Sequence, residues 1–452
     1  MPLLKKAAPQ DEGGGRPRMA ISDVIPSYRF GSRGEDMRTV GVVNRSSTSI
    51  CLYCKGDKML CGKSSCPLIA KAVAMVKHRP RMDAEEIDGA APPGVFVGRT
   101  GYPKVYVGPM IPPYYENTEI LDAPERWIGK EISDIIDYRY SLIRGKVRTS
   151  IWEPQVGGRL LDSLQELAMA AQPVDSEATF TKRPDSKLTL SAEVQPFGPS
   201  APLKSFKVSS LRVDRRIEKA HYDRDLKAAD AVLDLYSRGL SVTRIQRAFS
   251  MGMFGVGSRR KLVPTRWSIT AVDNSLSLAF LENVKRFETI DEYRVYVFRN
   301  LDNIFVAILS PEKWKFEWIE AWFPGTAWNE GGSRPAMMGD YEPHWGRTTY
   351  ASIGGCYYSA RLALAERLIR ERRQASALVL REIHPGYILP VGVWNVRESV
   401  RTTLRTKPAV FDTFDAAVKF ACTNLTIPLK NWIETSTLMK QAFFQKKISD
   451  YL

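Results

Sequence analysis

The sequence predicts an α+β protein: a mixed central body of sheets and helices, a small N-terminal cysteine module and a flexible C-terminal tail. Three observations support this fold class. The 452 residues are 44% hydrophobic and 25% charged, a composition typical of a globular protein with a large core. Strand-like alternation and helical periodicity are interspersed along most of the chain. Six cysteines are too few for a disulfide scaffold in so long a chain, and four of them fall between positions 51 and 66.

The chain is strongly basic. Lys and Arg outnumber Asp and Glu by 65 to 50, which gives a net charge of +15 and a pI near 9.4. This excess favours polyanionic partners through counterion release, and nucleic acid is the commonest polyanion of the cytoplasm. No apolar run approaches the eighteen or so residues that cross a bilayer, and no signal-peptide pattern is present. We therefore expect a cytoplasmic, nucleoid-associated protein with no membrane partner.

The N-terminal part contains a tail and a cysteine module. Residues 1–38 are rich in Gly, Pro and Arg, which predicts a disordered basic tail. Residues 39–80 include the string CLYCKGDKMLCGKSSCP, with the spacing C-x2-C-x6-C-x4-C, and a short helix is expected at 67–77. Four thiolates with no open position are typical of a structural Zn²⁺ site, whereas ferredoxin clusters use other spacings. The predicted zinc ligands are Cys51, Cys54, Cys61 and Cys66.

Residues 81–213 predict a mixed α/β region. Apolar residues alternate at Val95–Val97 and at Val105–Val107, which predicts a hairpin around Thr100–Pro103, with Arg99 and Lys104 beside the turn. The same patterns predict helices at 130–144 and 159–171, and strands at 177–182, 187–194 and 205–213.

Residues 214–444 are expected to form the core domain, which begins with helices at 214–238 and after a Ser241 cap. The turn at Gly239 between them is compatible with two motifs. In a helix-turn-helix, Arg244 and Arg247 would face a duplex. An αα-hairpin without a role in DNA binding has the same pattern, and we favour it.

The basic loop Gly255–Asp273, GVGSRRKLVPTRWSITAVD, is the most informative part of this domain. Its glycines let the backbone approach a ligand, and its guanidinium groups match pairs of phosphate oxygens. An aromatic ring follows on which a base could stack, and the chain then turns apolar, as a strand entering a core would. An ordinary solvated loop can carry similar charge. The predicted nucleic-acid contacts are Arg259, Arg260, Lys261, Arg266 and Trp267.

The rest of the core domain contains a second loop without periodicity. Residues 324–355 are rich in Gly and aromatic residues, and we expect them to line one basic groove together with residues 255–273. Around this loop the patterns predict a helix capped by Ser275, strands at 292–298, 304–309, 315–323, 376–383 and 388–394, and helices at 356–373, 395–403, 414–424 and 429–444. Cys356 and Cys422 stand alone in apolar segments and are interpreted as buried thiols.

The sequence does not define a reaction. A two-metal nuclease needs several carboxylates within about 4 Å of its ions, and Asp273 and Glu320 are candidates. His344 could act as an acid or base, or hold a nucleotide. No HExxH string, GxxxxGK[ST] loop or GxGxxG after a strand is present. An enzyme acting on DNA or on a nucleotide therefore stays an alternative to a binding protein, and a nucleotide ligand stays open with it.

The last eight residues, QKKISDYL, resemble the motif by which DNA-processing proteins bind the sliding clamp PCNA. In that motif a 3₁₀ turn gathers aliphatic and aromatic side chains into one apolar plug, and a glutamine fills a polar pocket. The alternative is a helix end that docks on its own domain. The residues that carry the resemblance are Gln445, Ile448, Tyr451 and Leu452, the last standing where a second aromatic residue is common.

Together these features resemble the archaeal Nre family of DNA repair proteins. The match runs from about position 40 to the C-terminus and rests on the cysteine string, GVFVGRTGYPKVYVGPMIPP, GSRRKLVPTRWSITAVD, GGCYYSARLALAERL, REIHPGYILPVGVWNVRESVR and the terminal QKKISDYL. Four cysteines combined with a clamp motif resemble the A type of that family. The resemblance implies DNA-damage repair coordinated with the replication clamp, but no reaction. We therefore expect a DNA-binding repair factor recruited by PCNA.

Overall fold

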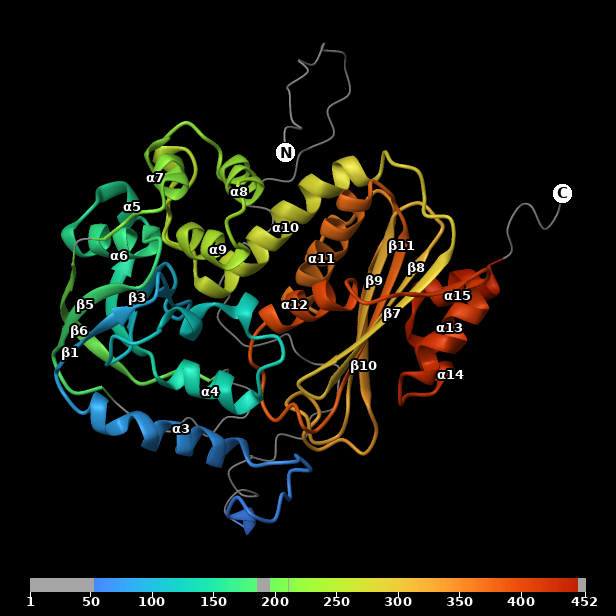
Figure 1. Ribbon diagram of the computed structural model, residues 1–452, viewed down its shortest axis with the longest axis horizontal. Helices are drawn as coiled ribbons and strands as arrows, with labels where there is room; N and C mark the ends of the chain where they lie inside the picture. The colour runs from blue at the N-terminus through green and yellow to red at the C-terminus, as the bar shows by residue number, and fades with distance from the viewer. Residues whose placement is uncertain (1–52, 185–195, 210, 446–452) are drawn as a thin grey trace.

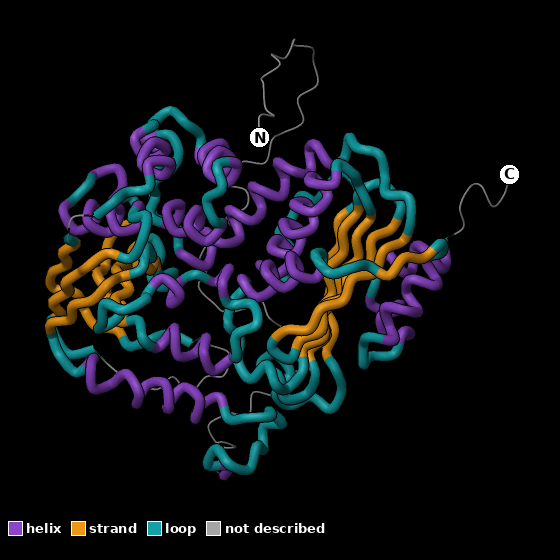
Figure 2. The backbone as a smooth tube through the Cα atoms, in the orientation of Figure 1, coloured by secondary structure: helices purple, strands orange, loops and turns teal. Residues whose placement is uncertain are grey.

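The computed structural model describes residues 53–184, 196–209 and 211–445. Within them the α+β class is confirmed, because two six-stranded sheets lie on either side of a layer of helices (Figure 1). Figure 2 shows the same division, with the strands of the two sheets separated by helices. The expected tail at 1–38, Cys51, the expected strand at 187–194 and the last seven residues of the chain lie outside the described residues.

The first sheet has the strand order β1-β5-β6-β4-β3-β2, and its neighbouring strands are antiparallel except for β4 and β6. The predicted hairpin is confirmed, with Val97 paired to Val107. The helix predicted at 130–144 ends early, because Ile143 already begins a strand. The strands are β1 (Glu86–Ala91), β2 (Val95–Val97), β3 (Lys104–Ile111), β4 (Ile143–Ser150), β5 (Val174–Phe180) and β6 (Ser200–Val208).

Helices surround this sheet and share its core. The predicted helix at 67–77 is confirmed and extends to Met82, and the expected helix at 214–238 is broken in two around Asp223. Helices that follow residue 213 pack on the same apolar cluster as this sheet. These helices are α3 (Pro67–Met82), α4 (Ile132–Tyr140), α5 (Glu153–Val156), α6 (Arg159–Met169), α7 (Arg215–Tyr222), α8 (Ala228–Ser237) and α9 (Val242–Ser250), with short 3₁₀ turns η1 (Glu119–Asp122), η2 (Pro124–Arg126) and η3 (Gly257–Arg259).

Helices α8 and α9 form the αα-hairpin, and the predicted Ser241 cap is confirmed, because its hydroxyl accepts a hydrogen bond from the amide of Arg244. The helix-turn-helix interpretation is wrong. Arg244 pairs with Asp214 at 3.2 Å, and Arg247 is 8% exposed and pairs with Asp122. Neither arginine can therefore read a duplex.

The second sheet has the order β10-β9-β11-β8-β7-β12, in which β9 and β11 are parallel. Strands β8 and β11 are buried along their whole length, because helices cover both faces of the sheet. Two expectations are wrong: part of the 324–355 loop is the strand β10, and the strand expected at 388–394 is an irregular segment that leads into a helix at Trp394. The strands are β7 (Tyr293–Asn300), β8 (Asn303–Ser310), β9 (Lys315–Trp322), β10 (Ala336–Glu342), β11 (Ser376–Ile383) and β12 (Ala409–Phe411).

Two helical layers cover the second sheet. The layer between the sheets contains α10 (Thr265–Val284), α11 (Gly355–Glu371) and α12 (Trp394–Thr403). The outer layer contains α13 (Phe414–Thr423), α14 (Leu429–Thr435) and α15 (Thr437–Phe444), on the far side of the molecule from α7 (Figure 1). No helix in the described part of the chain has the length and apolar character that membrane spanning requires.

Helix α10 begins ten residues earlier than the sequence predicts. Residues after Trp267 were expected to form a strand, with a helix beginning only at Ser275, but one helix of 20 residues covers both. The helix is buried on most of its sides, and its buried positions include polar residues such as Thr270 and Asn274. A helix buried all round has no clear 3.6-residue period, so its pattern is easily read as that of a strand.

Candidate nucleic-acid interface

The predicted basic loop contains η3 and the first half of α10, and hydrogen bonds hold the connection between them in place. The amide of Leu262 donates to the carbonyl of Ile151 at 2.7 Å, and Gln155 donates to the carbonyl of Arg260 at 2.9 Å. At the start of α10, the hydroxyl of Thr265 accepts a hydrogen bond from the amide of Val97 at 3.0 Å. These bonds attach the backbone of the segment to the first sheet and to the residues that follow β4.

Arg260 is buried and its guanidinium is occupied, so it is not placed for the predicted phosphate contact. Its side chain is 6% exposed and donates to the carbonyls of Gly255, His221 and Asp223 at 2.7, 2.6 and 2.7 Å. Burial lowers the pKa of this guanidinium. The residue therefore has a structural role, because it ties the basic segment to the end of α7.

The other three predicted cations are available to a ligand. Arg259 and Arg266 are exposed, and Lys261 is half-buried. The ammonium group of Lys261 lies 5.7 Å from the ring centre of Trp152, an exposed aromatic residue. In the described part of the chain, none of these three cations is paired with a carboxylate.

The docked hairpin adds cations that the sequence did not connect to this site. Tyr102 in the hairpin turn packs against Trp267, with ring centres 5.2 Å apart. Lys104 is exposed beside this turn, and Arg148 on β4 is exposed opposite Tyr106 on β3. We define the basic face as the six cations and three aromatic residues that this packing brings together: Arg99, Lys104, Arg148, Arg259, Lys261 and Arg266, with Tyr106, Trp152 and Trp267.

Residues 255–273 and 324–355, which were expected to line one groove, contact each other at one place. The hydroxyl of Thr270 lies near Gly355. Burial raises the pKa of Tyr350, and a hydrogen bond with Thr270 opposes that shift. Arg266 acts electrostatically on Tyr350 and Cys356. The middle of the second stretch instead forms the edge strand β10. The two stretches therefore meet where α10 and α11 begin.

Asp273 is a structural residue and not an accessible catalytic group. It is fully buried and accepts hydrogen bonds from Arg397 at 3.0 and 3.2 Å, from Gln246 at 2.8 Å and from Ser359 at 2.5 Å. Burial raises the pKa of Asp273, and the guanidinium of Arg397 opposes that shift. The four side chains belong to α10, α12, α9 and α11, so the cluster joins the helices between the two sheets.

The other two catalytic candidates lie apart from Asp273 and from each other. Glu320 is buried and pairs with Arg381 at 2.8 Å. The ring nitrogen Nδ1 of His344 lies 3.3 Å from the carbonyl oxygen of Trp314. Trp314 precedes β9 and Glu320 is near the end of that strand, so at about 3.3 Å per residue the two sites are roughly 20 Å apart. The three candidates share no contact partner in the described part of the chain.

Cys356 does not supply a nucleophile in this arrangement. It is half-buried in the first turn of α11, beside Glu320. Burial, and then the neighbouring carboxylate, raise the pKa of its thiol. A thiol is nucleophilic as its thiolate, which these surroundings disfavour. The sequence predicted a buried thiol here, whereas Cys356 and Cys422 are both half-buried.

The cysteine module is described in part. Cys54 is buried in a turn whose amides, that of Leu60 most strongly, lower the pKa of its thiol. Cys66 precedes α3 as its N-cap residue. An amide-stabilised thiolate suits metal ligation, although no three metal-binding side chains converge within the described residues. Cys61 is half-buried, and Cys51 lies outside them, so the four-cysteine zinc site stays a prediction.

The predicted clamp motif begins where the described chain ends. Helix α15 ends at Phe444, and Gln445 follows it as an exposed residue with extended backbone angles. The other three motif residues, Ile448, Tyr451 and Leu452, lie outside the described residues. The chain therefore leaves the helix at the first residue of the motif.

Comparison with known proteins identifies relatives along nearly the whole chain. A family model described as "Archaeal Nre, N-terminal" matches residues 60–329, and one described as "Archaeal Nre, C-terminal" matches residues 342–451. The chain is 44% identical to the DNA repair protein NreB of Archaeoglobus fulgidus, over 86% of this chain and 97% of that protein. No solved structure matches the chain.

Two NreA proteins are also similar. The chain is 38% identical to the DNA repair protein NreA of Archaeoglobus fulgidus, over 82% of this chain and 92% of that protein. It is 34% identical to NreA of Haloferax volcanii, over 82% of this chain and 90% of that protein. By identity the chain is nearer to this NreB than to these NreA proteins, although its motifs resemble the A type.

Replacing Asp273 by Asn should destabilise the protein by about 3–5 kcal/mol, because the change removes one of the two carboxylates that pair with the buried guanidinium of Arg397 and leaves it only Glu398. Urea unfolding followed by circular dichroism measures this free energy. The control is Asp415→Asn, which removes an exposed ion pair with Lys419 and should cost less than about 1 kcal/mol. Equal effects of the two changes would contradict the structural role of Asp273.

Proposed function

The chain belongs to the archaeal Nre family of DNA repair proteins, and we propose that it binds DNA through its basic face while the sliding clamp PCNA recruits it through the C-terminal motif. The basic face is the observation that supports the proposed DNA binding. Its six cations have no ion-pair partner among the described residues, and three aromatic side chains lie among them. A surface of this composition matches a phosphate backbone with bases near it.

The geometry of the basic face supports contact with the sugar–phosphate backbone. Arg259, Lys261 and Arg266 are held by a segment that is hydrogen-bonded to the first sheet, so little ordering is needed on binding. Guanidinium groups bind phosphate oxygens in pairs, and such contacts position a protein without reading sequence. We therefore propose binding with weak dependence on base sequence.

The tail supports recruitment by the clamp. Gln445 is exposed directly after α15, and the spacing of Ile448, Tyr451 and Leu452 matches the clamp motif. Clamp binding and DNA binding then use different parts of the chain, because the basic face belongs to the first sheet and the tail follows the outer helices of the second (Figure 1). The separation lets one molecule hold both partners.

An enzyme acting on DNA or on a nucleotide is the weaker alternative. Asp273 is buried in an ion pair, Glu320 is neutralised by Arg381, and His344 lies at the other end of β9. A reaction centre needs its groups within reach of one substrate. These candidates therefore give the enzyme alternative no geometric support.

We further propose that zinc is a structural cofactor held by Cys51, Cys54, Cys61 and Cys66. The module packs on the second half of the chain, where the ammonium of Lys63 donates to the carbonyl of Gly325 at 2.6 Å. A metal that fixes this turn would keep the module in place against residues 325–330. Its chemistry would be structural, because four thiolates leave no open coordination position.

Replacing Arg259, Lys261 and Arg266 together by Ala should weaken binding to a DNA duplex on the order of 100-fold at 0.1 M salt, and should reduce the slope of log K against log salt by about 3. Fluorescence anisotropy across a salt series measures both quantities. The matched control replaces three exposed lysines of the outer region, Lys407, Lys419 and Lys430, and has the same charge change. An identical slope in the two triple variants would show that net charge, and not the basic face, governs binding.

Deleting residues 446–452 should abolish retention of the protein by immobilised PCNA, since it removes the apolar plug of the motif. DNA affinity should be unchanged. A full-length variant with Tyr451→Ala should lose most retention as well, and Lys447→Ala serves as the control. Undiminished retention of the deleted protein would assign clamp contact to another surface, or exclude it.

Metal analysis of the purified protein should find about one zinc per chain, because four thiolates bind one tetrahedral ion. Chelation should lower the melting temperature of the wild-type protein. Cys61→Ser should lower both the zinc content and the melting temperature. Cys422→Ser, in an apolar segment of the second half, is the control. Iron in place of zinc, or full zinc content in the Cys61 variant, would overturn the assignment.

A further inference from the structure

Helix α7 presents a basic surface that the proposed function does not use. At about 100° per residue, Arg215, Lys219 and Tyr222 fall within roughly 60° of arc on one side of the helix. Both cations are exposed, and Tyr222 is 72% exposed. Ile217 and Ala220 lie on the opposite side and are buried in the core of the first sheet. The helix is thus anchored on one face and open on the other.

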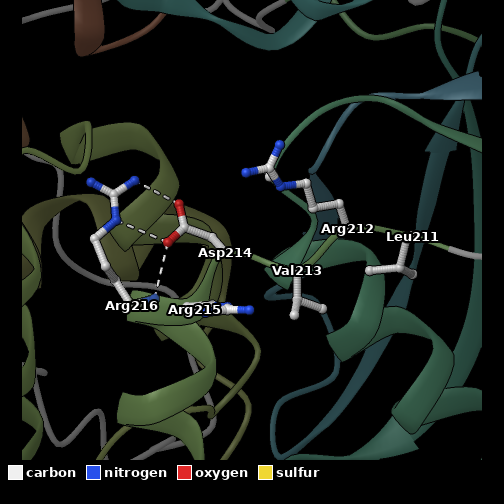
Figure 3. A pocket seen from close by; sticks show the side chains of 7 residues that line it. Leu211, Arg212, Val213, Asp214, Arg215 and Arg216 are labelled. Carbon is white, nitrogen blue, oxygen red and sulfur yellow. Dashed lines mark hydrogen bonds and ion pairs between the residues drawn. The ribbon is translucent and has the colours of Figure 1, made fainter.

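A cleft of about 760 Å³ adjoins the start of this helix and is lined by Ala171 and the segment from Leu211 to Arg216. The carboxylate in it, Asp214, is bound by Arg216 at 2.7 Å and by Arg244 at 3.2 Å. The hydrogen bonds from Arg216 lower the pKa of Asp214. Figure 3 shows this pair, with the side chain of Arg212 standing apart from it.

The charge of this region is strongly positive. Two arginines already bind the single carboxylate of the cleft, whereas Arg212 and Arg215 are exposed and have no ion pair in the described part of the chain. Glu218 lies beside the open face of α7 but outside the arc of the two cations and the tyrosine. Asp223 follows the helix and accepts hydrogen bonds from the amides of Asp225 and Leu226, at 3.2 and 3.0 Å. We call Arg212, Arg215, Lys219 and Tyr222 the α7 stripe.

The α7 stripe continues into the basic face. Arg260 donates to the carbonyls of His221 and Asp223, and the amide of Gly257 donates to the carbonyl of Arg224 at 2.9 Å. These bonds place η3, which carries Arg259, directly against the end of α7. A strand held on the basic face can therefore extend along the helix.

Resting on the proposed DNA binding, we propose that the α7 stripe binds single-stranded DNA. Its cations would contact phosphates, and Tyr222 would stack on an unpaired base. The ring of Tyr222 touches the edge of His221, with ring centres 5.1 Å apart, and stays largely open. A base in an intact duplex is stacked on its neighbours and has no free face to offer, so the tyrosine distinguishes unpaired from paired DNA.

The test measures the affinity of the full-length protein for a labelled oligonucleotide of about 20 residues, single-stranded or annealed into a blunt duplex. Tyr222→Ala should weaken single-strand binding by roughly 5-fold to 100-fold and leave duplex binding within about twofold. Tyr222→Phe should retain single-strand affinity, because it keeps the ring. Tyr115→Ala, at another exposed tyrosine, is the matched control and should change neither affinity.

The outcomes separate this inference from the proposed function. If the wild-type protein binds both DNAs and Tyr222→Ala binds the single strand as well as wild type, the α7 stripe is not a single-strand site, while the basic face stands. An equal loss for duplex and single strand also overturns the inference. If the wild-type protein binds neither DNA, the proposed function itself fails. Equal melting temperatures of the variants exclude misfolding as the cause of a loss.

Discussion

The buried ion pair between Asp273 and Arg397 is the constraint on which the arrangement of the molecule depends. It connects α10 to α12, and Gln246 and Ser359 extend it to α9 and α11. These helices separate the two sheets, so the pair fixes how the two halves of the chain meet. Two charges this deeply buried are costly to separate, because Asp273 alone would lack water and a counter-ion, and Arg397 would keep only its pair with Glu398.

Helix α10 links this buried cluster to the surface. Its middle holds Asp273, and its first turn presents Arg266 and Trp267 next to the hairpin of the first sheet. The packing around Asp273, two turns further along α10, therefore determines where Arg266 and Trp267 lie on the surface. Internal packing also determines the position of Arg259. The guanidinium of Arg260 donates to backbone carbonyls and holds η3 against α7, and Arg259 beside it stays exposed. Structural cations and exposed cations alternate within one short segment.

The sequence predicted the elements whose signals are local. Helices α9 and α11 and strands β7–β9 were located, because caps, turns and periodicity mark them. The first half of helix α10 was missed because the helix is buried on most sides and has no clear period. The role of Arg260 was missed because its partners, the carbonyls of His221 and Asp223, lie nearly forty residues away in the chain. The contributions of Arg148 and Trp152 depend on the docking of the hairpin, which no local pattern reveals.

Amide hydrogen exchange, measured with and without DNA, tests most directly whether the basic face is where DNA lies. Bound phosphates and bases should shield the backbone beneath them, so exchange should slow in residues 99–104, 148–152 and 257–267. The outer helices α13–α15 should exchange at the same rate in both samples. Unchanged exchange in those three segments at saturating DNA, or protection confined to the outer helices, would contradict the account.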